Sequence, residues 1–482
     1  MTRLHDLTAL EQAAAVRAKE VSPTELVEHY LARIGALDAG LGAFITVTAD
    51  RARAAAAAAE ERLRAGGELP PLLGVPTAIK DLNNTAGVRT TFGSTVTADF
   101  FPEVDDAVVT ALAGAGTISL GKTNTPEFGF PCYTDNDLAG PARCPWDTTR
   151  LAGGSSGGAA VAVAAGLVPF AQGSDGGGSI RIPASINGLF GIKPTRGRVS
   201  NAPLGAEITG LGTNGPLART VRDAAAMLDA MAGPVAGDPY WAPPPGEAFL
   251  ACAERPAGRL RIGRFLESAM PDVELAPEVA AAFDDAARLL EELGHEVVDV
   301  PPGLLGPDVL GSFEKVWSLS GTLLPVAPER VAELRPLTRV LRERGLALSA
   351  QEAMAAMTEL RLFSRRFVVA TAGFDALLAP VTTMTPRPLG WFDADGDGAE
   401  DFERQKRYAA FTAVFNVTGQ PAVSVPLHWT DDDLPVGTML VGRPADEATL
   451  LALAAQLEQA RPWAHRHPPA WDQDASPGGL VG

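Results

Sequence analysis

The stretch 151–195 constrains this chain more than any other part of its 482 residues. It contains two glycine-rich runs that carry serine, Gly-Gly-Ser-Ser-Gly-Gly at 153–158 and Asp-Gly-Gly-Gly-Ser at 175–179. Glycine permits backbone conformations closed to other residues and lets other groups approach closely. The consecutive glycines 176–178 also leave their N–H groups uncovered, and such a run can form a nest for a negative oxygen. The pattern predicts that the main chain itself forms part of a site around each serine.

The charge balance indicates which partners this chain binds. Its formal net charge is −18 and its isoelectric point is about 4.8, which argues against nucleic acid or an anionic membrane surface. The first residues lack the layout of a signal peptide, and the uncharged run at 159–171 is too short to span a bilayer. The three cysteines have no C-x-x-C spacing, which favours a reducing cytoplasm and gives no signal for zinc or a disulfide. We expect a cytoplasmic monomer or homodimer that binds a small molecule, and neither nucleic acid nor membrane.

Hydrophobic periodicity predicts an α/β protein. Ser22 and Glu25 form a capping box, after which apolar residues recur with helical spacing. Short apolar segments bounded by turn residues predict buried strands, one of which ends at Lys80. We expect helices at 22–37, 50–64, 105–113, 218–231, 277–293 and 445–460, a mostly helical segment at 310–370, and strands at 72–80, 117–120, 260–265, 296–300, 376–380 and 422–426. This alternation predicts a sheet covered by helices, with a helical layer over residues 1–65.

Two motifs match ligand-binding patterns but lack the required context. Residues 116–123 fit G-x-x-x-x-G-K-[ST], yet helix-like residues precede them and the four intervening residues are typical of a strand. Residues 393–398 resemble a calcium loop, but the twelfth position is Arg404 rather than glutamate. We interpret the first as a strand that ends in a turn and the second as a solvated acidic turn, and we expect no metal or cofactor.

A serine needs a base before it can act as a nucleophile. None of the six histidines lies near the glycine runs in the sequence, and G-x-S-x-G is absent around Ser155 and Ser179. Lysine is scarce, and a lysine in an apolar setting can lose its proton, unlike arginine. Lys80, at the end of an apolar strand, is such a residue.

Taken together, these residues resemble the amidase signature family. The resemblance runs nearly end to end, and its motifs include Lys80, Gly-Gly-Ser-Ser-Gly-Gly at 153–158, Asp-Gly-Gly-Gly-Ser-Ile-Arg-Ile-Pro at 175–183, Gly-Lys-Thr-Asn-Thr-Pro-Glu at 121–127, Gly-Ile-Lys-Pro-Thr at 191–195, Gly-Pro-Leu-Ala-Arg-Thr at 215–220, Phe-Asn-Val-Thr-Gly-Gln-Pro-Ala at 415–422 and Leu-Pro-Val-Gly at 434–437. The chain looks closest to bacterial amidases that act on amide oligomers and aryl amides. The resemblance implies one domain over 1–482 with a central twisted mixed sheet between helices, in which 70–230 forms the core with the active site and 231–482 completes the sheet.

The resemblance also implies the catalytic groups. Ser179 resembles the nucleophile that forms the acyl-enzyme, and Lys80 resembles the base, which must be neutral to act. Ser155 resembles the serine that relays the proton between them, preceded by a cis peptide bond at Gly154–Ser155. Backbone N–H groups of Gly176, Gly177, Gly178 and Ser179 would hold the oxyanion.

The resemblance implies two further site residues, and at one position of the site this sequence differs from the family pattern. Gly129 occupies the place where the family presents a backbone carbonyl to the leaving nitrogen, and Ser156 is grouped with the substrate-binding residues. Position 176, commonly Thr or Ile in the family, is Gly here, which removes a side chain beside the oxyanion nest. The substrate pocket is expected to involve 128–136 and the loop 199–215, which we interpret as mobile.

Each residue taken singly also has a structural interpretation. Lys80 can pair with Asp81, and Ser155 and Ser156 can cap a helix that begins at 157. The remaining polar and aromatic candidates are expected to be structural: Asp175 paired with Arg181, Lys193, and Trp317, Phe411 and Phe415 as core residues.

Three functions remain open on the sequence. The first is an amidohydrolase that cleaves carboxamide C–N bonds, with carbamates and esters as further substrates. The second is an amidotransferase subunit that generates ammonia for a partner acting on tRNA. The third, from a different class, is a nucleotide-binding protein that uses residues 116–123.

Overall fold

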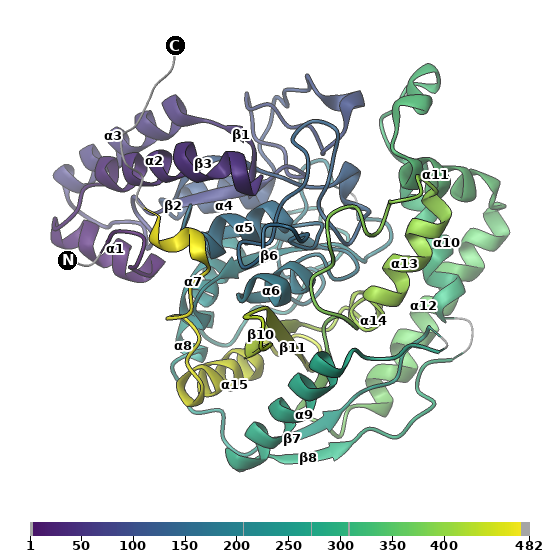
Figure 1. Cartoon of the computed structure of the whole chain (residues 1–482). Helices are drawn as coiled ribbons and strands as arrows, with labels where there is room; N and C mark the ends of the chain where they lie inside the picture. Colours follow the sequence, from purple (N-terminus) through teal and green to yellow (C-terminus); the bar gives the residue numbers. More distant parts are fainter. Residues whose placement is uncertain (1–2, 206, 271, 307–308, 474–482) are drawn as a thin grey trace.

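Short apolar segments of the sequence form the strands of a large mixed sheet (Figure 1). The structure, a computed structural model, describes residues 3–205, 207–270, 272–306 and 309–473. The strands are β1 (Phe44–Val47), β2 (Pro76–Lys80), β3 (Ile118–Thr123), β4 (Phe170–Asp175), β5 (Phe190–Lys193), β6 (Thr213–Ala218), β7 (Arg261–Arg264), β8 (Glu296–Asp299), β9 (Ala376–Pro380), β10 (Ala422–Trp429) and β11 (Pro435–Gly442). Eight of them pair in the order β4-β6-β5-β10-β11-β9-β7-β8. Neighbours from β4 to β9 run antiparallel, whereas β9, β7 and β8 run parallel.

The remaining three strands form a smaller sheet beside the first, in the order β1-β3-β2. Side chains join β2 to β4 at the edge of the large sheet. The backbone N–H of Lys80 donates to Gln172 Oε1 at 2.9 Å, and Thr77 Oγ1 donates to the carbonyl of Phe170 at 3.3 Å. This junction brings the end of β2 close to the end of β4, where the second serine-bearing run begins.

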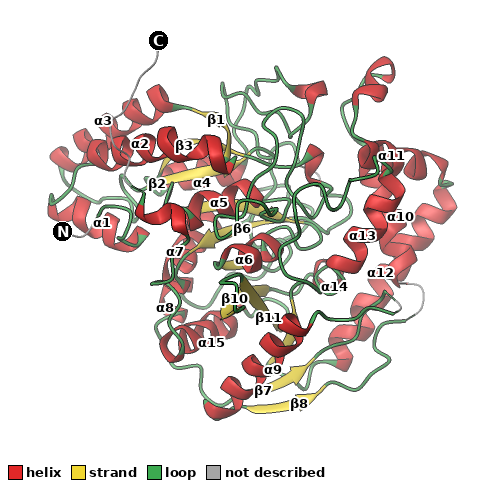
Figure 2. Cartoon of the chain, viewed as in Figure 1, coloured by secondary structure: helices red, strands yellow, loops and turns green. Residues whose placement is uncertain are grey.

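Helices cover both faces of the large sheet (Figures 1 and 2). They are α1 (Ala9–Ala18), α2 (Pro23–Leu41), α3 (Ala49–Ala65), α4 (Ala107–Gly114), α5 (Gly157–Ala164), α6 (Arg181–Asn187), α7 (Val221–Met231), α8 (Phe249–Cys252), α9 (Pro277–Glu292), α10 (Val309–Thr322), α11 (Pro336–Ala347), α12 (Ala350–Ala370), α13 (Gly398–Tyr408), α14 (Val414–Thr418) and α15 (Glu447–Ala460). No described helix is both long enough and apolar enough to cross a membrane.

Alternating side chains of the central strands pack into two different cores. On β10, Val423 and Val425 pack in the core that also holds α7, α9 and α15, whereas Ala422 packs with α6, α10, α12 and α14. On β11, Leu440 faces the first core and Met439 the second. Because successive strand residues point to opposite faces, these apolar runs indicate a sheet buried on both sides. The predicted fold class, a single α/β domain with a mixed sheet between helices, is confirmed.

The structure differs from the sequence prediction where strands are short or rich in glycine and proline. Strand β1 lies within the predicted helical layer 1–65, and β4, β5 and β11 were not expected. The helix predicted from Ala218 begins at Val221, because residues 213–218 form β6. Gly215 and Pro216 in that strand hide its period-2 signal. The predicted strand that ends at Lys80 is confirmed.

Candidate active site

Lys80 is fully buried at the end of β2. Its Nζ lies 2.8 Å from Ser155 Oγ, 3.0 Å from Ser174 Oγ and 3.3 Å from the carbonyl of Ser174. Burial lowers the pKa of Lys80 from 10.5 to about 7, and the negative charge of Asp175 acts in the opposite direction. A lysine with this pKa is largely neutral at slightly alkaline pH, so its nitrogen has a lone pair with which to accept a proton.

Asp81 follows Lys80 but pairs with a different lysine. Its Oδ1 lies 3.3 Å from Lys122 Nζ, and this Nζ also donates to Asn83 O at 2.6 Å and to Thr90 Oγ1 at 2.8 Å. Among the described residues, no carboxylate forms a salt bridge with Lys80. The interpretation of Lys80 as the partner of Asp81 is therefore wrong.

The contacts of Lys122 also show whether the segment 116–123 is a phosphate loop. Gly121, Lys122 and Thr123 lie within β3 rather than in a loop before a helix. Lys122 is buried and its ammonium is bonded to protein groups. The segment is a strand, as the sequence context predicted, and it has none of the geometry with which a phosphate loop holds nucleotides.

The first serine run adopts the expected backbone, with a cis peptide bond between Gly154 and Ser155. Ser156 is buried, and its Oγ accepts from Ser174 N at 3.2 Å and donates to Ser174 O at 3.1 Å. The side chain of Ser156 does not cap α5, so that interpretation is wrong. Instead, Thr134 Oγ1 accepts from the N–H of Gly157 at 3.1 Å. Ser156 thus fastens the first serine run to β4.

The second serine run is shaped by one buried carboxylate. Asp175 accepts hydrogen bonds from the N–H groups of Gly178 at 2.8 Å and Ile180 at 3.1 Å. The guanidinium of Arg181 donates to it twice, from Nε and Nη2, each at 2.9 Å. Burial acts to raise the pKa of Asp175, but Arg181 holds that pKa below its usual value. The predicted pairing of Asp175 with Arg181 across the loop is confirmed.

Residues from a distant part of the chain clamp this loop, and sequence reasoning missed them. Asn416 Nδ2 donates to the carbonyls of Asp175 at 2.9 Å and of Leu211 at 3.0 Å. Thr412 Oγ1 donates to the carbonyl of Gly177 at 2.5 Å. The run 415–422 was recognised as a motif, but no sequence signal indicates that its polar groups dock on the serine loop.

Some backbone N–H groups of the loop 176–179 donate hydrogen bonds within the protein, and others remain available to a ligand. The N–H of Gly178 is taken by Asp175, whereas those of Gly176, Gly177 and Ser179 have no acceptor among the described residues. Gly178 has a φ of 139°, and a Cβ added there would lie 2.7 Å from Ile182 Cδ1. The loop therefore requires glycine at 178 and presents three of the four predicted donors as candidates for an oxyanion site.

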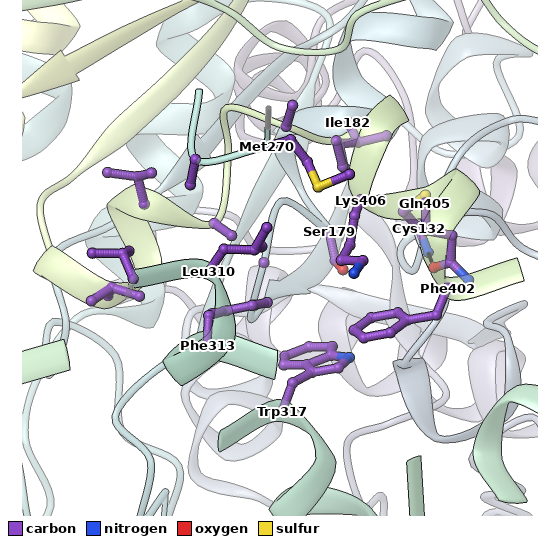
Figure 3. A pocket seen from close by; sticks show the side chains of 18 of the residues that line it. Cys132, Ser179, Ile182, Met270, Leu310, Phe313, Trp317, Phe402, Gln405 and Lys406 are labelled. Atoms are coloured by element: carbon purple, nitrogen blue, oxygen red, sulfur yellow. Dashed lines mark hydrogen bonds between the residues drawn. The ribbon is translucent and has the colours of Figure 1, made fainter. Parts of the chain in front are cut away.

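Ser179 lies between two cavities that meet at its side chain. A polar cavity of about 320 Å³ is lined by Ser155, Gly129, Ser174 and Ser179, and an apolar cavity of about 100 Å³ is lined by Gly177, Ser179 and aromatic side chains (Figure 3). Phe130, Ser179 and Trp317 line both. Ser179 is thus bordered by two cavities, one polar and one apolar, whereas Ser155 lines the polar cavity and not the apolar one.

Gly129 lies directly beside Ser155. Its φ is 72°, and a Cβ built there would lie 3.3 Å from Ser155 Oγ. The preceding residue, Phe128, also has a positive φ of 50°, which is uncommon for an aromatic residue. The backbone at 128–129 is thereby turned toward the hydroxyl of Ser155.

The structure also shows where the other residues expected in or near the site lie. Ser155 and Ser179 line the same cavity, but the hydrogen bonds among the described residues do not include one between their hydroxyls. The loop 199–215 contributes several residues to the polar cavity, and its residue 206 lies outside the described residues. Phe411 and Phe415 are buried in the core as expected, whereas Trp317 lines both cavities.

The calcium-like segment is built as an acidic turn. Asp393 pairs with Arg335 at 2.8 Å, and Asp395 pairs with Arg404. Asp397 caps α13 by accepting from the N–H groups at its start. Residues 394–397 are exposed, in agreement with the interpretation of this segment as a solvated acidic turn.

The fold and the site together define a class of α/β enzyme in which a buried lysine and two serine-bearing glycine loops meet beneath paired cavities. Comparison with known proteins identifies the class further. The family model described as Amidase matches residues 25–451. The chain belongs to the amidase family, whose enzymes hydrolyse amide C–N bonds, and the predicted resemblance and enzyme class are confirmed at this level.

Similar proteins cover almost the whole chain. A protein of Mycobacterium tuberculosis, provisionally named amidase AmiB2, is 41% identical over 467 residues, which is 95% of this chain and 97% of that protein. A glutamyl-tRNA(Gln) amidotransferase subunit of Azotobacter vinelandii is 38% identical, and the match covers 96% of this chain and 99% of that protein. The solved structure of a 6-aminohexanoate cyclic dimer hydrolase with its substrate is 32% identical, with a TM-score of 0.89 over 98% of this chain and 100% of that one.

Proposed function

We propose that this protein is an amidohydrolase that cleaves carboxamides through an acyl-enzyme on Ser179, with Lys80 as the base. One observation carries the proposal: the buried Nζ of Lys80 lies 2.8 Å from Ser155 Oγ, and its pKa is lowered to about 7. A base poised near the working pH is most effective in moving protons. The loop that carries Ser179 presents N–H groups where the charge of a tetrahedral intermediate develops.

The reaction begins when Ser179 attacks the amide carbonyl carbon. As the C–O bond forms, the hydroxyl proton of Ser179 passes to Ser155 Oγ, and the proton of Ser155 passes to Lys80 Nζ. The carbonyl oxygen becomes an oxyanion that accepts from the N–H groups of Gly176, Gly177 and Ser179. We expect the hydrogen bond between the hydroxyls of Ser179 and Ser155 to form when substrate binds, because catalytic hydrogen bonds often tighten only in the substrate complex.

Collapse of the intermediate breaks the C–N bond. The proton held on Lys80 returns through Ser155 to the leaving nitrogen, which departs as a neutral amine. Water then attacks the ester on Ser179, passes a proton to the Ser155–Lys80 pair, and releases the carboxylic acid as the proton returns to Ser179 Oγ. Carbamates and esters present the same electrophilic carbon, so we include them among the substrates.

The test is release of 4-nitroaniline from a simple 4-nitroanilide by the purified protein alone. Ser179→Ala removes the nucleophile, and the expected loss is at least about 10⁴-fold in kcat, because little catalysis remains without it. Ser364→Ala, on α12 and outside both cavities, serves as a matched control and is expected to keep wild-type rates. Turnover by Ser179→Ala within tenfold of wild type would show that the proposed nucleophile is wrong.

A second candidate function rests on the likeness to the amidotransferase protein of Azotobacter vinelandii, 38% identical over nearly the full chain. In that case the protein would release ammonia from glutamine for a partner. The two functions differ in the substrate that is cleaved and in whether a partner protein is required. Hydrolysis of anilides by the isolated chain favours the amidohydrolase, whereas activity confined to glutamine and dependent on a co-purifying partner favours the amidotransferase.

A further inference from the structure

The aromatic residues of α10 lie over the serine loop where side chains are missing. Trp317 packs on Gly176: a Cβ added to Gly176 would lie 3.2 Å from Trp317 Cζ3 and 3.3 Å from Cη2. Phe313, one helical turn earlier, packs in the same way on Gly177, with a Cβ there 3.7 Å from Phe313 Cζ. Residues four apart share one face of a helix, so α10 presents both rings to the loop. The indole therefore lies in the space that a side chain at 176 would fill.

Trp317 also separates the two cavities beside Ser179. Its ring stacks on Phe313 with centroids 5.6 Å apart and meets Phe130 edge-on at 5.8 Å. It lines both the polar and the apolar cavity, and Figure 3 shows its indole extending along the apolar one toward Phe402. A change in this ring thus changes the shape of the space next to the nucleophile.

The position of Ser155 decides which part of an amide enters which cavity. Under the proposed function, Ser155 returns the proton to the leaving nitrogen. Ser155 and Gly129 line the polar cavity but not the apolar one. The amine portion must therefore lie in the polar cavity, and the acyl portion extends from Ser179 into the apolar one.

The walls of the apolar cavity determine the kind of acyl group. Phe313, Trp317 and Phe402 supply aromatic surface. The charge of Lys406 in its wall is balanced by Glu314 at 2.5 Å and Glu403 at 2.6 Å. Burying a charged acyl group here would leave that charge without a partner, which is costly.

We propose that Trp317, seated on Gly176, is the residue that limits acyl size, and that the substrates are amides of uncharged, apolar carboxylic acids. This inference rests on the proposed function, because it assigns the two cavities from the role of Ser155. The inference also explains the glycine at position 176, because the absence of a side chain there leaves room for the Trp317 ring that limits the acyl cavity.

The experiment compares 4-nitroanilides that share one amine and differ in acyl group, from acetyl through butanoyl to hexanoyl. Trp317→Ala enlarges the cavity, and the ratio of kcat/KM for hexanoyl to that for acetyl is expected to rise at least tenfold over wild type. One methylene in an apolar pocket is worth about 10–200-fold in such ratios. Trp317→Leu, which keeps more of the packing, is expected to shift the ratio in the same direction by a smaller factor.

Two further variants make the test specific. Gly176→Ile pushes the indole into the cavity and is expected to lower the same ratio. The double variant with Trp317→Ala is expected to recover it, because residues in contact show non-additive effects. Leu324→Ala alters only the polar cavity, so it is expected to leave the acyl ratio within twofold of wild type.

The outcomes separate this inference from the proposed function. Active Trp317→Ala and Trp317→Leu variants with an unchanged acyl ratio would overturn the inference, while a dead Ser179→Ala would leave the function standing. A succinyl anilide hydrolysed as fast as the butanoyl one would overturn the preference for uncharged acids. A wild-type protein that cleaves no anilide would overturn both.

Discussion

The proposed role of Lys80 as the base depends on the residues around it. Its ammonium is buried and bonded to serine oxygens, whereas the neighbouring Asp81 is committed to Lys122. If Asp81 paired with Lys80, the carboxylate would favour the charged ammonium and keep its pKa high. The pairing of Asp81 with Lys122 therefore keeps the carboxylate that follows Lys80 in the sequence from forming an ion pair with Lys80.

The lowered pKa of Lys80 predicts how the rate depends on pH. In the proposed mechanism the neutral amine is the active form, so kcat/KM is expected to rise about tenfold per pH unit below pH 7 and to level off above it. The measurement is anilide hydrolysis between pH 5 and 9, at pH values where the fold is intact by circular dichroism. A rate independent of pH over this range, or one still rising steeply between pH 8 and 9, would contradict the assignment of Lys80 as the base.

Lys80→Arg is the matched variant for this profile. Arginine keeps the positive charge and cannot lose its proton in a protein. The variant is expected to stay inactive at every pH in the range. An active Lys80→Arg variant whose rate still rises near pH 7 would assign the titration to another group, such as Lys193, whose pKa burial also lowers to about 7.

At the scale of elements, the side chain of Gln172 contributes to the junction of the two sheets. Gln172 on β4 accepts from the N–H of Lys80 and donates to Asn83 Oδ1 at 2.9 Å and Asn214 Oδ1 at 2.8 Å. These contacts help to set the distance between the end of β2, which carries Lys80, and the end of β4, which leads to Ser179.

Replacing Gln172 with leucine is expected to weaken both stability and catalysis. The buried N–H of Lys80 would lose its acceptor, at a cost of about 1–3 kcal/mol. A lower melting temperature and a lower kcat are expected, with KM nearly unchanged because substrate touches neither group. Thr77→Val removes another hydrogen bond between β2 and β4, from Thr77 Oγ1 to the carbonyl of Phe170, and serves as the comparison; equal damage from both changes would mean that the contact with Lys80 is unimportant.

The sequence predicts those features of the fold and the site that depend on residues close together in the chain. The strand that ends at Lys80, the two serine runs and the acidic turn at 393–398 follow from composition and turn residues close by. Strands such as β6 were missed because their glycine and proline suppress the alternation that marks a strand. The docking of Trp317 on Gly176 depends on how α10 packs across the fold, and no local pattern encodes that.

For the molecule as a whole, the end of the described chain packs against its beginning. Trp471 is buried, its Nε1 donates to Asp6 Oδ1 at 3.0 Å, and its ring packs under the guanidinium of Arg219. Arg33 on α2 donates to the carbonyl of Trp471 at 3.2 Å. The last described turn therefore holds the N-terminal helices to the rest of the protein.

Trp471→Ala tests the importance of this contact. Removing a buried tryptophan costs about 3–5 kcal/mol, so the melting temperature is expected to fall by several degrees. Because Trp471 lies outside both cavities, kcat/KM at 20 °C is expected to remain at the wild-type value. Trp241→Ala, at a largely exposed tryptophan, is the control; a loss of stability as large as that of Trp471→Ala would show that burial is not what matters.

The clamp on the serine loop has a consequence for synthesis of the protein. The side chains of Lys80, Ser155 and Ser179 leave the ribosome long before Thr412 and Asn416, whose contacts shape the turn around the nucleophile. A nascent polypeptide that already contains all three side chains thus still lacks the contacts that shape the loop around Ser179. Under the proposed function, alignment of these groups waits until residue 416 has been synthesised and has folded onto the loop.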